Sequence, residues 1–279
     1  MAITLSPRRM GWHVSPVGLL AACVIAFWAV IAVIGPWIAP HPPGAIVDYD
    51  FFGPLSAQYP MGTDYLGRDM LSRVLAGARY TVGIALAAVL IAVSAGVVLG
   101  MAAAVTGGWV DTVVSRVLDA VSAIPSKLFG LVVVAAIGSS IPVLIGVLAV
   151  VYTPGSYRFA RALAVNVNTM DYVTVARARG ERTAYLIRHE ILPNILGPVL
   201  ADMGLRFVFI VLLLSGLSFL GLGVQPPHAD WGSLVRENMG GLSFGAPAVL
   251  MPSVAIATLT ISVNLMIDNL PTRIRDRSD

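Results

Sequence analysis

Long apolar stretches separated by shorter polar segments dominate this chain of 279 residues. An α-helix needs about 20 apolar residues to cross the hydrocarbon core of a membrane. We predict six such spans, with glycine, proline and most of the charged residues between them. Their approximate bounds are residues 17–39, 80–105, 113–137, 142–159, 195–222 and 246–266, and Pro125 is predicted to break the third. The pattern therefore predicts an all-α polytopic membrane protein that forms a single transmembrane domain over residues 1–279.

The composition supports a membrane protein and excludes a soluble one. Apolar residues make up 57% of the chain and charged residues only 12%, which is far from the balance of a soluble domain. The first span is longer than the apolar core of a signal peptide, so we expect it to be a retained helix. The one cysteine, Cys23, lies within it and cannot form a disulfide inside the chain.

Positive charges concentrate in the termini and in alternate loops of this layout. Those in the termini and even-numbered loops are Arg8, Arg9, Arg116, Arg158, Arg161, Arg177, Arg179, Arg182, Arg188, Arg273, Arg275 and Arg277. Those in the odd-numbered loops are Arg68, Arg73, Arg79 and Arg236. Because cytoplasmic loops carry the excess of positive residues, we predict that both termini and residues 160–194 are cytoplasmic. Residues 40–79 would then form a periplasmic or extracellular loop.

The most basic segment of the chain lies between the fourth and fifth spans. Here Asp171 is predicted to cap a first helix, Gly180 to interrupt it, and Glu181 to open a second helix. Pro193 is predicted to end the regular hydrogen bonding of that second helix. Small residues near the bend would let another protein approach closely; they are Ala176, Ala178 and Gly180. We interpret this segment as a docking element, whose arginines suit either acidic groups of a partner or anionic lipid.

Three groups of motifs carry a resemblance to a known family. The pattern A-x-A-x-G at 176–180, followed by I-L-P-N at 191–194, resembles the coupling loop of the inner-membrane permeases of binding-protein-dependent ABC importers. The segments GTDYLGRD at 62–69 and FLGLGVQPP at 219–227, with DWG at 230–232, are similar to the dipeptide, oligopeptide and nickel branch. Within that branch they resemble the second of the two permease subunits.

The resemblance implies the type I permease fold of ABC importers in a bacterial plasma (inner) membrane. The implied partners are a second homologous permease, two ATP-binding cassette subunits and an extracytoplasmic substrate-binding protein. ATP and Mg²⁺ would be bound by the ATPase subunits, with no cofactor in this chain. Dipeptides or oligopeptides are the implied cargo, and nickel or another small solute is the alternative. The residues implied to couple to the ATPase are Ala176, Arg177, Ala178, Gly180, Pro193 and Asn194.

One part of the loop departs from the family pattern. The family's loop usually begins Glu-Ala-Ala, whereas this chain has Thr174 and Val175 ahead of Ala176. An acidic side chain is therefore missing from the segment that contacts the partner in the family.

No motif for catalysis or nucleotide binding is found in the sequence. A P-loop needs a lysine after a glycine-rich run, and the only lysine, Lys127, follows Ser126 with no such run before it. The dipeptide His189-Glu190 lacks the second histidine of a zinc-protease motif, and four scattered histidines predict no metal site. Basic residues without interleaved aromatics predict no nucleic-acid binding. We therefore expect a transport subunit that is not an enzyme; the rivals are a self-sufficient secondary transporter, which would show two similar halves, and a membrane scaffold.

Charged side chains inside predicted spans need a specific explanation. Each costs about 2.5–3.5 kcal/mol at the centre of a span. Asp202 and Arg206 are four residues apart on one helix face and are predicted to neutralise each other. Lys127 is predicted to reach the interface, or to pair with Asp119 or Asp202, or to face the passage and attract a peptide carboxylate. Lys127, Asp202 and Arg206 are thus the candidate residues of a translocation pathway.

Overall fold

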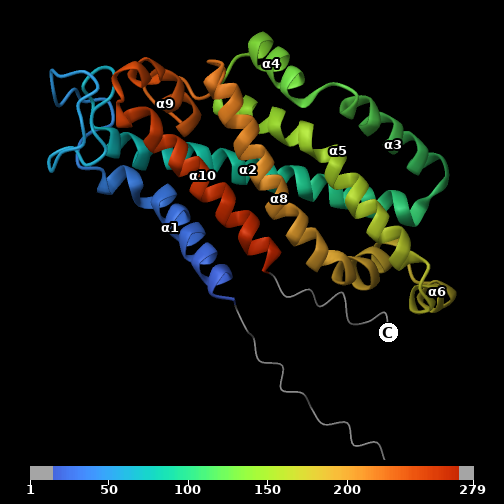
Figure 1. Cartoon of the computed structure of the whole chain (residues 1–279). Coiled ribbons are helices and arrows are strands. Elements are labelled where there is room, and N and C mark those ends of the chain that lie inside the picture. Colours follow the sequence, from blue (N-terminus) through green and yellow to red (C-terminus); the bar gives the residue numbers. More distant parts are fainter. Residues whose placement is uncertain (1–14, 270–279) are drawn as a thin grey trace, which may run out of the picture.

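The computed structural model describes residues 15–269, and this part of the chain is helical, with isolated β-bridges as its only extended pairings (Figure 1). Predictions that concern Arg8, Arg9 and the arginines of the C-terminal tail lie outside the described residues. The helices are α1 (Pro16–Ile38), α2 (Met70–Thr106), α3 (Gly108–Ser122), α4 (Ser126–Ile137), α5 (Ile141–Asn168), α6 (Asp171–Ala178), α7 (Thr183–Tyr185), a π-helical turn η1 (Leu186–Ile191), α8 (Leu192–Phe219), α9 (Trp231–Glu237), a 3₁₀ helix η2 (Met239–Phe244) and α10 (Pro247–Asp268).

Five helices of the described region are long and apolar enough to cross a membrane, and the pair α3 and α4 makes a sixth span if it is counted as one. These two helices are bent by 81° relative to each other, so the third span is broken, as the sequence predicts. The physical cause is Pro125 at the break, because its ring fixes the backbone and it has no N–H to continue the helical ladder. The predicted all-helical membrane fold is confirmed, and so is the predicted break of the third span at Pro125.

Helices α2 and α5 extend about ten residues beyond the predicted spans. Helix α2 begins at Met70 instead of residue 80, because the Asp69 side chain accepts hydrogen bonds from the N–H groups of Leu71 and Ser72 at 3.3 and 3.1 Å. The segment between α1 and α2 is therefore shorter than the predicted loop 40–79. In the same way α5 continues to Asn168, past the predicted end of the fourth span.

The long helix α2 lies at the centre of the bundle, where it packs most extensively against α5 and also contacts α1 and α8. Gly96 and Gly100, four residues apart, face α5 at the crossing. A Cβ at position 96 would lie 2.5 Å from the Cβ of Ser156 and 2.7 Å from the backbone nitrogen of Tyr157. The two glycines allow the backbones to approach closely, as small residues commonly do between membrane helices.

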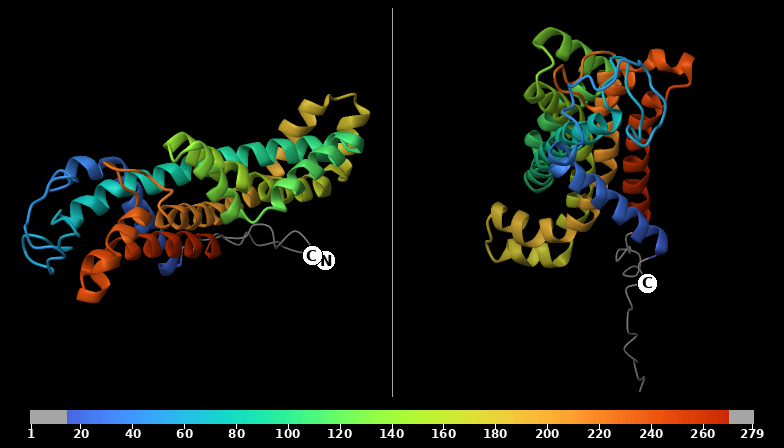
Figure 2. Two further views of the ribbon diagram at one scale, coloured as in Figure 1. Left: turned by 90° about the horizontal axis from the view of Figure 1, so that it is seen from above. Right: turned by 90° about the vertical axis from the view of Figure 1, so that its left-hand side faces the viewer.

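One end of the bundle carries a polar cap formed by the α1–α2 connection and by α9 with its flanking turns (Figures 1 and 2). At its centre, the fully buried carboxylate of Asp64 lies 2.6 Å from both the Nε of Arg68 and an Nη of Arg73. Glu237, at the end of α9, lies 2.9 Å from Arg73 and 3.2 Å from Arg68. These ion pairs join the two segments whose motifs lie far apart in the sequence.

Asp230, at the start of α9, is the second residue that holds the cap together. Its carboxylate accepts hydrogen bonds from the N–H of Gly232 at 2.8 Å and from the hydroxyl of Ser218 at 2.8 Å. Burial raises the pKa of Asp230, and these hydrogen bonds oppose the rise. The neighbouring Trp231 donates its indole N–H to the backbone oxygen of Val74 at 3.0 Å, which fixes α9 against α2.

Candidate functional site

The basic segment forms a bent pair of short helices at the end of the bundle opposite to the cap (Figures 1 and 2). Gly180 adopts the left-handed conformation with φ of +84°. Its N–H bonds to the oxygen of Arg177 at 3.0 Å, and the next N–H, of Glu181, bonds to the oxygen of Ala176 at 3.3 Å. This pair of bonds is the Schellman motif that ends helices at a glycine, so the predicted interruption at Gly180 is confirmed.

The two predicted helix starts in this segment need correction. Asp171 is the first residue of α6, and the capping position belongs to Met170, which makes no side-chain capping bond. The carboxylate still lies in the first turn, where it interacts favourably with the helix dipole. The second helix begins at Thr183, after Arg182, and not at Glu181.

The hydrogen-bonding pattern changes at Pro193, as predicted, but the chain does not leave the helix there. This residue lies in the first turn of α8, and the helical backbone runs through it from Thr183 to Phe219. The preceding turn, Leu186–Ile191, is π-helical, and such wide turns are found as local insertions within α-helices. Pro193 has no N–H to donate, which costs little at the start of a new α-helical stretch. The bent segment therefore continues directly into a membrane-spanning helix.

The structure buries one of the predicted contact residues. Ala176 is fully buried and packs with Val173 and Leu186 in a small apolar cluster of its own, separate from the main core. It cannot touch a partner directly in this conformation, so its predicted contact role is corrected to that of a spacer between α6 and η1. Arg177 and Ala178 on the same helix are exposed.

The remaining predicted coupling residues lie on the surface of the same segment. Arg177 donates to the side-chain oxygen of Asn168 at 2.9 Å, which ties α6 to the end of α5. Pro193 and Asn194 are exposed, and the Asn194 amide donates to the backbone oxygen of Glu190 at 2.6 Å. Nearby, burial raises the pKa of the Tyr172 phenol, and the Glu190 carboxylate raises it further.

The charged residues inside the spans follow the predictions only in part. Arg206 and Asp202 form the predicted ion pair on α8, with an Nη–Oδ distance of 3.0 Å. Lys127 lies exposed in the first turn of α4, and within residues 15–269 no ion pair includes it. The predicted pairing of Lys127 with Asp119 or Asp202 is wrong, because Asp119 lies 3.5 Å from Arg158 and Asp202 is held by Arg206.

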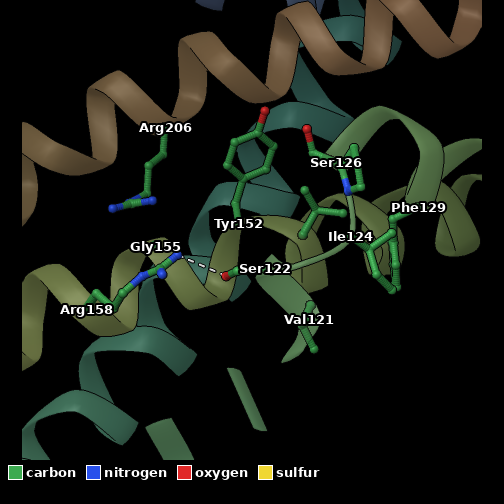
Figure 3. Close-up of a pocket in the computed structure, with 11 residues that line it drawn as sticks. Val121, Ser122, Ile124, Ser126, Phe129, Tyr152, Gly155, Arg158 and Arg206 are labelled. Atoms are coloured by element: carbon green, nitrogen blue, oxygen red, sulfur yellow. Dashed lines mark hydrogen bonds between the residues drawn. The ribbon is translucent and has the colours of Figure 1, made fainter. Parts of the chain in front are cut away.

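A pocket of about 250 Å³ lies where α3 and α4 break apart, between α5 and α8 (Figure 3). Arg206 borders it from α8, while Tyr152, Gly155 and Arg158 border it from α5. Ser122 and Ser126 line it from the two sides of the break. The only charged side chains in its lining are the two arginines.

A family described as binding-protein-dependent transport system inner membrane component matches residues 96–276. The chain belongs to this family. It is 35% identical over 275 residues to a protein of Brucella abortus named as a peptide transport system permease, covering 96% of this chain and 90% of that protein. It is 33% identical to a di/tripeptide transport system permease of Pseudomonas aeruginosa, covering 91% of this chain and 84% of that protein. A glutathione transport system permease of Pectobacterium atrosepticum is 30% identical, covering 90% of this chain and 82% of that protein.

Membership makes this permease a transport component of the inner membrane, in agreement with its apolar helices. In the described residues no cluster of three or more His, Cys, Asp or Glu side chains is placed to hold a metal ion.

Sequence reasoning missed the position of Arg158 in the permease. The positive-inside argument placed this arginine in a cytoplasmic segment, whereas it lies on α5 beside the pocket. The sequence holds a partial signal, because Tyr152, Gly155 and Arg158 recur every three residues and so lie on one side of a helix. The bend at Pro125, which opens the pocket toward them, could not be foreseen from this spacing.

Proposed function

We propose that this chain is a channel-forming permease subunit of an ATP-driven importer for dipeptides or oligopeptides. The observation that carries the proposal is the exposed bent segment α6–α7, which continues through η1 into the membrane-spanning α8. Such a segment transmits a push at the membrane surface to the helices around a passage. The names of the relatives, which are peptide, di/tripeptide and glutathione permeases, support a peptide cargo.

The proposed assembly contains a second homologous permease, two ATP-binding cassette subunits and an extracytoplasmic substrate-binding protein. ATP and Mg²⁺ are bound by the cassette subunits in this proposal, and the chain has no ATPase site of its own. The position of its only lysine supports this, because Lys127 lies at the start of α4 in a spanning segment and not in a glycine-rich phosphate loop.

We propose that the bent segment α6–α7 and both termini are cytoplasmic, and that the polar cap faces outward. The distribution of arginines supports this orientation. So does the position of the bent segment at the opposite end of the bundle from the cap (Figure 2). Ser15 and Asn269, the ends of the described region, are joined by a hydrogen bond, which places the two ends of the described chain side by side. The cap is then available to receive cargo from the binding protein.

The coupling surface that we propose comprises Arg177, Ala178 and Gly180, all of which are exposed. Closure of the ATPase subunits would press on this surface and move α6 and η1 as one unit, because the apolar cluster of Val173, Ala176 and Leu186 holds them together. The continuous backbone at Pro193 and Asn194 would carry the movement into α8. There the pair Asp202 and Arg206, together with Lys127 on α4, are proposed to border the passage.

Replacing Gly180 by valine is expected to uncouple ATP hydrolysis from uptake in the assembled complex. A β-branched residue in the left-handed conformation costs about 1–2 kcal/mol, which shifts the loop toward other conformations by about tenfold. Peptide uptake per ATP hydrolysed should therefore fall by about that factor. The measurement is uptake and phosphate release from the same proteoliposomes.

The matched control is Gly245→Val in the outer cap. Gly245 also has a positive φ, of +64°, and at neither glycine would a Cβ meet any atom within 4 Å. The two variants therefore introduce similar strain at opposite ends of the molecule. An unchanged ratio of uptake to hydrolysis is expected for Gly245→Val. Full coupling in Gly180→Val would count against the proposed role of the loop.

The cargo is tested by competition in the reconstituted complex. Uptake of a labelled dipeptide should be inhibited by unlabelled dipeptides and tripeptides and left unaffected by nickel ions. If nickel ions inhibited uptake and unlabelled peptides did not, the metal branch of the family would be favoured over the peptide branch.

A further inference from the structure

The pocket at the break between α3 and α4 carries an excess of positive charge. The guanidinium groups of Arg158 and Arg206 both border it (Figure 3). Arg206 is paired with Asp202, whereas Arg158 lies 3.5 Å from the exposed carboxylate of Asp119. The ammonium of Lys127 is on the first turn of α4, directly after the lining residue Ser126. Two cations thus line the pocket, and the carboxylates paired with them, Asp202 and Asp119, are not part of its lining.

The backbone adds further positive potential at the same place. Helix α4 begins at the pocket, and its capping position is Pro125, which makes no side-chain capping bond. The first N–H groups of a helix have no partner within the helix and favour negative charge. Two neighbouring hydroxyl groups are already engaged, since Ser122 accepts from Arg158 at 2.9 Å and Tyr152 donates to the backbone of Phe209 at 2.9 Å. The groups still open to a ligand are therefore the N–H groups at the start of α4, the two guanidinium groups and the hydroxyl of Ser126.

Gly155 shapes the wall in which Arg206 lies. A Cβ at this position would lie 2.5 Å from an Nη of Arg206, so only glycine lets the guanidinium lie directly against α5. The Arg206 side chain is 13% exposed, although it lies near the middle of α8, where an arginine is costly. A charged residue at this depth in a membrane helix marks a functional site by default, and the adjacent pocket is the site that Arg206 would serve.

We propose that this pocket binds the carboxylate of a peptide in transit, with Arg158 and Arg206 as its main ligands. The inference rests on the proposed function. It adds the chemical group of the cargo that is recognised and the pocket that recognises it. A pocket of about 250 Å³ holds one terminal residue and not a whole oligopeptide. Charge-assisted hydrogen bonds between guanidinium and carboxylate groups are strong and directional, so the free C-terminus is the part of the cargo that the pocket recognises.

The test compares trialanine with its C-terminal amide in proteoliposomes that contain the complete complex. The affinity of the binding protein for each peptide is measured separately, and uptake is compared with the binding protein saturated. Arg158→Gln is expected to lower the ratio of acid to amide uptake by about tenfold, the effect of losing one hydrogen bond to a charged group. Arg158→Lys, which keeps the charge, should give a ratio of acid to amide uptake between those of Arg158→Gln and the wild type. The control Arg116→Gln removes an exposed cation of α3 outside the pocket and should leave the ratio unchanged.

A second variant, Gly155→Ala, keeps the proposal testable if Arg158→Gln fails to fold. Gly155→Ala leaves every charge in place but displaces the Arg206 guanidinium, and it should also lower the ratio of acid to amide uptake. If Arg158→Gln and Gly155→Ala both assemble, transport trialanine and keep the wild-type ratio, the pocket is not a carboxylate site while the proposed function stands. If the wild-type complex transports neither peptide, the proposed function fails and this inference with it.

A phospholipid headgroup could supply the same chemistry through its phosphate. In that case Arg158→Gln would reduce uptake of acid and amide equally, and the loss would vary with the fraction of phosphatidylglycerol in the vesicles. That result would overturn the assignment to cargo. A selective loss for the acid that is the same in phosphatidylglycerol and phosphatidylcholine vesicles would support it.

Discussion

Replacing Gly96 by alanine is expected to destabilise the permease by about 1–3 kcal/mol, the usual cost of forcing an extra methyl group into a packed interior. The new Cβ would lie 2.5 Å from the Cβ of Ser156 and 2.7 Å from a backbone nitrogen of α5. A backbone atom cannot rotate away, so α2 and α5 would have to separate. Because this crossing is the most extensive contact between helices in the described region, the effect should reach the whole bundle.

The same helix provides a matched control in Gly83. A Cβ there would meet no atom within 4 Å, and alanine is the better helix former by about 1 kcal/mol. Gly83→Ala should therefore be neutral or slightly stabilising. Gly100→Ala, whose Cβ would lie 2.8 Å from the backbone nitrogen of Arg161, should resemble Gly96→Ala. The measurement is the thermal unfolding of the purified protein in detergent. Equal stability of Gly96→Ala and Gly83→Ala would contradict the close crossing.

Replacing Asp64 by asparagine is expected to destabilise the polar cap by about 3–5 kcal/mol, the cost of breaking a buried ion pair by removing one charge. The Asp64 carboxylate is fully buried and lies 2.6 Å from each of two guanidinium groups. Of the two arginines, Arg73 has a side chain that is only 4% exposed and would keep Glu237 as its one remaining counter-charge. An asparagine amide also presents donors where the carboxylate presented acceptors.

Asp50→Asn is the control for this second prediction. Asp50 belongs to the same α1–α2 connection, but it is exposed, and its side chain forms no ion pair within the described residues. Its replacement should change the unfolding temperature little. Binding of the substrate-binding protein, measured on the assembled complex, should fall with Asp64→Asn and not with Asp50→Asn. Equal unfolding temperatures for the two variants would contradict the role given to the buried pair.

The features that the sequence could predict are those controlled by local chemistry. Apolar length located the spans, because the membrane sets how many residues a crossing helix needs. Gly180 could be assigned to a helix end because few other residues tolerate its backbone conformation. Asp202 and Arg206 could be paired because residues four apart meet on a helix face.

The features that were missed depend on contacts between distant segments. Ala176 is buried only because Leu186 of the π-helical turn packs against it, and no pattern within α6 reveals this. Pro193 is compatible with both a helix end and a helix start, and the turn before it decides between them. The position of Arg158 beside a pocket depends on the angle at Pro125, which the presence of a proline does not determine.

Reconstitution of the purified chain into vesicles, with and without its proposed partners, tests the central claim most directly. The claim is that this permease provides the passage and the coupling loop, while the energy comes from separate ATPase subunits. Vesicles with the complete complex should accumulate a labelled dipeptide above the external concentration only when ATP is supplied, and vesicles with this chain alone should accumulate none. Accumulation against the gradient by this chain alone would contradict the account.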